Sequence, residues 1–68
     1  MIKIAQRIKE LRLEKELTQA ELGKQLGLSK KTISHYENGV ILPVLETIIN
    51  MCRIFDVTAD YLLCLKDD

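Results

Sequence analysis

Side chains that can hydrogen-bond to nucleic-acid bases gather between residues 29 and 35 of this 68-residue chain. At roughly 100° per residue, one side of a helix through this segment carries Lys30, Lys31, Ser34 and His35. Lysine can donate to guanine O6 and N7, serine can bond to most bases, and histidine can donate to guanine or to a phosphate. A helix that inserts its N-terminal end into the major groove uses such side chains, although the same pattern also occurs on solvated helices.

The helix before this segment has a strong start signal. Thr18 is a candidate N-cap, with Glu21 at the return position of a capping box. Leu17 and Leu22 have the spacing of the hydrophobic staple that accompanies this motif. Gly27 suits the left-handed residue that ends a helix, so we expect a helix between Thr18 and Gly27.

A second short helix follows directly. Ser29 can cap it, Ile33 and Tyr36 form its inward face, and Asn38-Gly39 ends it. Gly23 lies inside the preceding helix, where glycine costs about 1 kcal/mol relative to alanine, which indicates close packing against the following helix. A tolerated glycine on an exposed helix is the alternative. Two short helices joined by a glycine-containing turn are typical of a helix-turn-helix.

Three further helices complete the expected fold. An apolar stripe predicts a first helix over about 3–15, formed by Ile4, Ile8 and Leu11. After the connection Val40–Pro43, a longer stripe predicts a fourth helix with Leu45, Ile48, Ile49, Cys52 and Phe55 facing inward. Thr58 can cap a short fifth helix. We therefore expect an all-α fold of five helices in one domain, residues 1–68.

Composition excludes several classes of protein. The N-terminus reaches charged residues at once, without the apolar region of a signal peptide, and no apolar run is long enough to span a membrane. Net charge is zero, but residues 1–39 carry eight basic and five acidic groups, whereas residues 40–68 carry two basic and five acidic groups. This asymmetry is compatible with a molecule that has one face for nucleic acid.

Neither metal nor enzymatic chemistry is expected. Cys52 and Cys64 lie twelve residues apart, too far for a zinc-binding pair without further ligands, so we interpret both as small buried apolar side chains. The chain has one histidine, no nucleophile paired with a plausible base and no phosphate-binding loop. We predict no enzyme activity and no cofactor.

Taken together, these stretches resemble the lambda-repressor/Cro family, also called XRE-type helix-turn-helix regulators. The resemblance runs from Ile4 to Leu65 and rests on the segments Leu17–Leu22, Gly27–Ser29, Thr32–Ser34, Tyr36–Gly39, Pro43, Leu45–Thr47 and Val57–Leu63. It implies a cytoplasmic transcriptional regulator, expected to be a repressor, that binds double-stranded DNA in a sequence-specific manner.

The resemblance also implies roles for single residues. The positions that match base-contacting residues of the family are Ser29, Lys30, Lys31 and His35. Those that match contacts to the sugar-phosphate backbone are Thr18, Gln19, Thr32 and Asn38. Arg12 and Glu37 resemble the ion pair that joins the first helix to the end of the third, with an independent solvated arginine as the alternative.

The sequence departs from the family pattern after the third helix. The connection is usually polar and often basic, but here it reads Val40-Ile41-Leu42, which removes expected phosphate contacts. Val44 stands where the family commonly has a capping serine, and valine cannot cap. The neutral net charge also differs from the basic character of many relatives.

Surplus apolar residues predict an assembly. Met51 and Ile54 lie off the predicted stripe, and Tyr61–Leu65 is apolar on every side. We therefore expect a homodimer through the fifth helix and part of the fourth, binding a palindromic site. Val40–Leu42 is expected to tuck under the fourth helix or to join the contact. The alternative function is an antitoxin or interaction module that sequesters a partner protein, such as a toxin or an antagonist.

Overall fold

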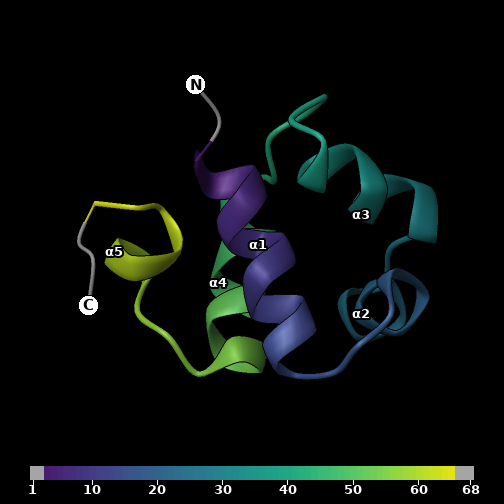
Figure 1. The fold of residues 1–68 in the computed structure, drawn as a ribbon, viewed down its shortest axis with the longest axis horizontal. Coiled ribbons are helices and arrows are strands. Elements are labelled where there is room, and N and C mark those ends of the chain that lie inside the picture. Colours follow the sequence, from purple (N-terminus) through teal and green to yellow (C-terminus); the bar gives the residue numbers. More distant parts are fainter. Residues whose placement is uncertain (1–2, 66–68) are drawn as a thin grey trace.

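The computed structural model describes residues 3–65 as five helices (Figure 1): α1 (Lys3–Glu14), α2 (Gln19–Leu26), α3 (Lys30–Glu37), α4 (Leu45–Phe55) and α5 (Ala59–Leu62). The predicted all-α, five-helix fold is confirmed, and the described range contains no strand. Along the longest dimension of 28 Å, α2 and α3 lie at one end and α5 at the other, with α1 and α4 between them (Figure 1). No helix within residues 3–65 is both long and apolar enough to cross a membrane.

Side-chain caps begin three of these helices. The Thr18 hydroxyl accepts from the Glu21 backbone N–H at 3.0 Å, and the Glu21 carboxylate accepts from the Thr18 N–H at 2.8 Å, so the predicted capping box is confirmed. Ser29 and Thr58 cap α3 and α5 through the corresponding hydroxyl contact. Val44 makes no side-chain hydrogen bond at the start of α4, as predicted.

Left-handed residues mark the helix ends. Gly27 has φ 73° after α2, as its position predicted. Glu16, Asp56 and Cys64 have φ values of 56°, 57° and 62° after α1, α4 and α5. A residue with a Cβ in this conformation costs roughly 1–2 kcal/mol, so these three turns carry local strain that glycine would avoid.

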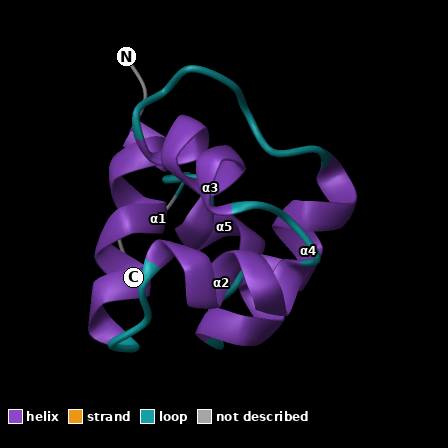
Figure 2. Cartoon of the chain, turned by 90° about the vertical axis from the view of Figure 1, so that its right-hand side faces the viewer, coloured by secondary structure: helices purple, strands orange, loops and turns teal. Residues whose placement is uncertain are grey.

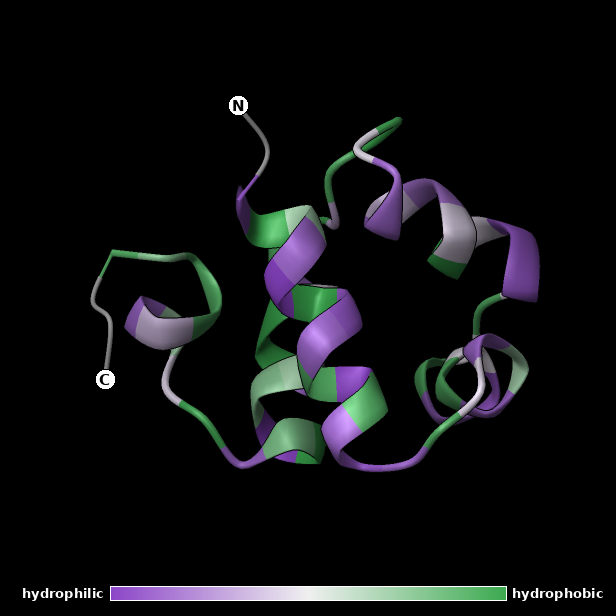
Figure 3. Ribbon diagram, viewed as in Figure 1, coloured by the Kyte–Doolittle hydropathy of each residue, from purple (hydrophilic) through white to green (hydrophobic). Residues whose placement is uncertain are grey.

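One core joins all five helices, and its buried members are Ile8, Leu11, Leu22, Ile33, Tyr36, Met51, Phe55 and Leu62. In Figure 3, hydrophobic residues make up most of α4 and much of the connection before it, whereas α3 consists mainly of hydrophilic residues and α2 of both kinds. Cys52 and Cys64 are free and only half-buried, whereas buried side chains were predicted, and burial raises the pKa of the Cys52 thiol.

The predicted inward stripe of α4 was wrong in part. Phe55 is buried as expected, and Ile48 and Cys52 are partly buried, but Leu45 is 72% exposed and Ile49 is also exposed. Met51 takes their place and is 0% exposed. Because α4 is apolar around most of its circumference, periodicity allowed several orientations, and packing against the other helices selected the one that buries Met51.

This orientation removes much of the basis for the predicted dimer surface. Met51 and Leu62 are completely buried within one copy of the chain, and Ile54 packs against the same core. The fifth helix is only four residues long, and of its predicted apolar run Leu65 is the one exposed residue. The segment Val40–Leu42 is exposed and does not tuck under α4.

Candidate nucleic-acid interface

The helices α2 and α3 form a tight pair whose geometry depends on Gly23. A Cβ atom at Gly23 would lie 2.6 Å from the Leu28 carbonyl oxygen and 3.3 Å from that of Ser29. The predicted close approach is therefore present, although the neighbour is the turn before α3 rather than the helix itself. The Leu28 N–H donates to the Gly23 carbonyl at 2.8 Å, which fixes this turn against α2.

In the structure, the side of α3 that carries Lys30, Lys31 and His35 faces away from the core. Ile33 and Tyr36 are buried against the core. On the other side Lys30 and Lys31 are exposed, and His35 is half-buried. Within residues 3–65, no hydrogen bond or ion pair holds either ammonium group. Both lysines are therefore available to donate hydrogen bonds to a ligand. Figure 2 views the molecule from the side on which α2 and α3 lie.

Several of the other predicted contact residues already make local hydrogen bonds. The Ser29 hydroxyl accepts from the Thr32 N–H at 3.1 Å and lies 3.0 Å from the Thr32 hydroxyl. The Asn38 amide donates to the Ser34 hydroxyl at 3.2 Å. These bonds orient the polar groups at both ends of α3. The two lysines, by contrast, keep their full donor capacity.

An ion pair fixes the end of α3 to α1. Arg12 Nε lies 2.6 Å from Glu37 Oε2, and Arg12 Nη2 donates to Glu37 Oε1 at 3.1 Å, a two-pronged arrangement with strong geometric preference. Arg12 Nη1 also donates to the Leu17 carbonyl at 2.8 Å. Arg12 is 7% exposed and the Glu37 side chain 2% exposed, so each charge is buried with its partner. This is the pair that the resemblance implied.

Gln19 belongs to the same network, which sequence reasoning missed. Its Nε2 donates to Glu37 Oε1 at 3.1 Å, linking the first residue of α2 to the last residue of α3. The family resemblance implies only a contact to the sugar-phosphate backbone for Gln19. The amide has a second N–H, so Glu37 orients this side chain without using all of its donor capacity. No sequence pattern signals a pairing across eighteen positions.

A second unpredicted contact holds α5 in place. Arg7 Nη1 donates to the Tyr61 carbonyl at 2.6 Å, and the Arg7 guanidinium lies 4.0 Å from the centre of the Tyr61 ring. A cation this close to a ring face is attracted by the π electrons. Arg7 thus fastens the short C-terminal helix to α1.

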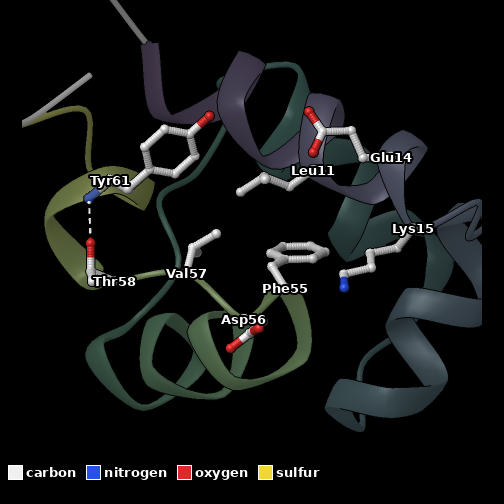
Figure 4. Close-up of a pocket in the computed structure, with 8 residues that line it drawn as sticks. All are labelled: Leu11, Glu14, Lys15, Phe55, Asp56, Val57, Thr58 and Tyr61. Carbon is white, nitrogen blue, oxygen red and sulfur yellow. Dashed lines mark hydrogen bonds between the residues drawn. The ribbon is translucent and has the colours of Figure 1, made fainter. Parts of the chain in front are cut away.

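A groove of about 550 Å³ lies between the end of α1, the end of α4 and α5 (Figure 4). Its lining residues come from the end of α1 and from the α4–α5 region: Leu11, Glu14, Lys15, Phe55, Asp56, Val57, Thr58 and Tyr61. None of the predicted contact residues lines it. The candidate interface is therefore the outward surface of α2 and α3, not this groove.

Comparison with known proteins agrees with this geometry. The sequence profile of the helix-turn-helix family matches residues 8–62. The chain is 35% identical over 63 residues to the uncharacterized HTH-type transcriptional regulator YobD of Bacillus subtilis, covering 93% of this chain and 56% of that protein. It thus spans about half the length of such curated relatives.

Two solved structures share the fold. One is the P22 c2 repressor in complex with a synthetic operator, with a TM-score of 0.83, 32% identity, and coverage of 88% of this chain and 91% of that one. The other is SinR, the master regulator for biofilm formation, in complex with DNA, with a TM-score of 0.80, 31% identity, and coverage of 88% and 97%. The chain therefore belongs to the helix-turn-helix family, in its lambda-repressor/Cro or XRE-type branch.

Proposed function

We propose that this protein is a cytoplasmic transcriptional repressor that binds double-stranded DNA in a sequence-specific manner, as a homodimer on a palindromic site. The observation that carries the proposal is the outward side of α3, where Lys30 and Lys31 are exposed with no partner within residues 3–65. The likeness to a repressor bound to its operator supports it.

In the proposed complex, α3 lies in the major groove and reads base edges. Lys31 lies in the first turn of α3, opposite the buried Ile33 and Tyr36, and donates to guanine O6 and N7. Lys30 and His35 flank it and contact neighbouring bases, and Ser29 bonds through its hydroxyl. These assignments depend on the N-terminal half of α3 entering the groove, which is the usual arrangement for a helix-turn-helix.

Contacts to phosphate groups would set the position of α3. The N-terminus of α2 offers the positive end of the helix dipole and the first-turn N–H groups that the capping box does not use, to which the side chains of Thr18 and Gln19 add donors. Thr32 and Asn38 contact the backbone on either side of the groove. Because Glu37 holds both Arg12 and Gln19, the same carboxylate that fixes α3 also orients the phosphate contact on α2.

The antitoxin alternative has weaker support. Antitoxin PezA of Streptococcus pneumoniae is 38% identical to this chain over 55 residues, but the match covers only 35% of that protein. The similarity therefore reaches only a minor part of PezA, and no described feature of this chain identifies a toxin as its partner.

Selection from a random duplex pool tests the proposal. Duplexes retained by the protein at physiological salt are sequenced after several rounds. We expect enrichment of one motif with two-fold symmetry and half-sites separated by about one helical turn, 10–10.5 base pairs. A pool that stays random after selection would contradict sequence-specific binding, and an asymmetric motif would contradict the dimer.

A further inference from the structure

His35 is the only histidine of the chain, and it lies on the side of α3 that faces away from the core. Its side chain is half-buried and comes one helical turn after Lys31, so the two side chains are neighbours. Within residues 3–65 the imidazole makes no hydrogen bond and no ion pair. Histidine is the side chain whose charge ordinarily changes between about pH 5 and pH 8. The candidate interface therefore contains one residue of the type that responds to pH in this range.

We propose that DNA binding by this protein is coupled to the uptake of a proton by His35, so that the affinity for a duplex rises as the pH falls. The inference rests on the proposed function, in which α3 enters the major groove. A protonated imidazole donates from both ring nitrogens, whereas the neutral ring has one donor and one acceptor. Phosphate oxygens and guanine O6 and N7 are all acceptors, and charge-assisted hydrogen bonds to them are the stronger kind.

No carboxylate described near His35 is free to hold its proton in the absence of DNA. Glu37 is the closest carboxylate along α3, but Arg12 and Gln19 both donate to it. The helices packed against α3 are α1 and α2, and their polar contacts at its C-terminal end are these same two side chains. Residues 39–45, which follow α3, contain no charged side chain. The protein itself thus offers the imidazole no anionic partner, and the duplex supplies one.

The charged groups that share the outward side of α3 with His35 are Lys30 and Lys31. In the free protein, a protonated imidazole would be a third positive charge on this side. Phosphates and base acceptors of a bound duplex neutralise the two ammonium groups, so a third charge costs less in the complex. The complex therefore binds more protons than the free protein, and by linkage it is stabilised by lower pH. The proton comes from the solvent.

The backbone at His35 is held in place on its C-terminal side. The Val40 N–H donates to the His35 carbonyl at 2.9 Å, which ties the connection after α3 to this residue. A homodimer on a palindromic site would carry two such histidines. The logarithm of the affinity can then change by up to about two for each pH unit.

Fluorescence anisotropy with the selected duplex, at fixed ionic strength between about pH 5.5 and pH 7.0, tests the coupling. In this range the lysines, thiols and α-amino group all stay largely protonated. We expect the affinity of the wild type to rise about tenfold toward pH 5.5, within the usual range for coupling between two ligands. His35→Gln keeps one donor and one acceptor but cannot gain a charge, so its affinity should change less than about twofold.

Lys30→Gln is the matched control, since it removes a charge from the same side of α3 without removing the histidine. It should lower the affinity at every pH and keep the rise toward pH 5.5. Circular dichroism checks that the variants are folded, and His35→Asn replaces His35→Gln if the latter is not. Calorimetry of the wild type in two buffers with different ionisation enthalpies measures the proton uptake directly and needs no variant.

Three results would overturn the inference: a wild-type affinity that does not change with pH, no proton uptake in calorimetry, or a His35→Gln variant that keeps the full rise. Failure of the proposed function gives a different result. A protein that binds the duplex equally well across the pH range contradicts only the coupling, whereas one that binds no duplex at any pH contradicts the DNA function on which the coupling rests.

Discussion

Lys31 is the residue whose environment argues most directly for base recognition. It is exposed on α3, directly opposite the buried side formed by Ile33 and Tyr36. If its ammonium donates to a guanine, Lys31→Ala should weaken binding to the selected duplex by about 1–3 kcal/mol and relax the preference at one base pair.

Gln19→Ala, at the start of α2, is the contrasting variant and should weaken binding to all duplexes about equally. Fluorescence anisotropy with selected and scrambled duplexes measures both. If Lys31→Ala lowers the affinity for the selected and the scrambled duplex equally, Lys31 contacts a phosphate and not a base.

Glu37 combines structural and positioning roles in one carboxylate. Removing its charge leaves the Arg12 guanidinium buried without a counter-charge, so Glu37→Gln should lower the free energy of unfolding by about 3–5 kcal/mol. Glu10→Gln is the matched control, because Glu10 is exposed and makes only surface contacts, a 3.8 Å ion pair with Arg7 and a 3.2 Å hydrogen bond from Gln6. Urea denaturation should show a change below about 1 kcal/mol for that control. Similar losses in the two variants would contradict the importance of the buried pair.

At the scale of elements, Gly23 lies where α2 meets the turn before α3. Helix propensity and steric contact predict opposite effects of adding a Cβ atom there. Helix propensity alone predicts that Gly23→Ala stabilises the protein by about 1 kcal/mol. The 2.6 Å approach of the new Cβ to the Leu28 carbonyl predicts instead a net loss of about 1–3 kcal/mol, since backbone must move. Lys24→Ala, one residue along the same helix and exposed, should change stability little. If Gly23→Ala is more stable than the wild type in urea denaturation, the Leu28 carbonyl can move away from the new Cβ at little cost.

The start of α4 offers a gain of stability. Val44 occupies the N-cap without a side-chain bond and is largely exposed. Val44→Ser should supply that bond and stabilise the monomer by about 0.5–2 kcal/mol. Thermal unfolding at low micromolar concentration should show a higher midpoint for Val44→Ser than for both the wild type and Val44→Ala. An equal effect of serine and alanine would mean that the cap does not form.

How far the sequence could predict each element depended on how local its determinants are. The capping box of Thr18 and Glu21 spans four residues, and it was predicted correctly because the interacting groups are close in sequence. The orientation of α4 could not be predicted, because Leu45 and Met51 are both apolar and tertiary packing decides which of them is buried. The contacts of Gln19 with Glu37 and of Arg7 with Tyr61 also escaped prediction, since they join residues 18 and 54 positions apart.

At the scale of the whole molecule, charge is divided between two regions of a neutral chain. Residues 1–39, which include α2 and α3, carry three more basic than acidic groups, and residues 40–68 carry three fewer. The buried ion pair keeps Glu37 from cancelling the charge of Lys30 and Lys31 at the candidate interface. The end of the molecule formed by α2 and α3 therefore keeps basic side chains available for phosphates.

The affinity ratio between the selected duplex and a scrambled duplex, measured by competition anisotropy over a series of salt concentrations, tests sequence-specific DNA binding most directly. We predict a ratio of about 10³ or more at physiological salt. The logarithm of each affinity should fall with the logarithm of salt by roughly 0.9 for each phosphate contacted. Equal affinity for the two duplexes, or binding that does not change with salt, would contradict the account.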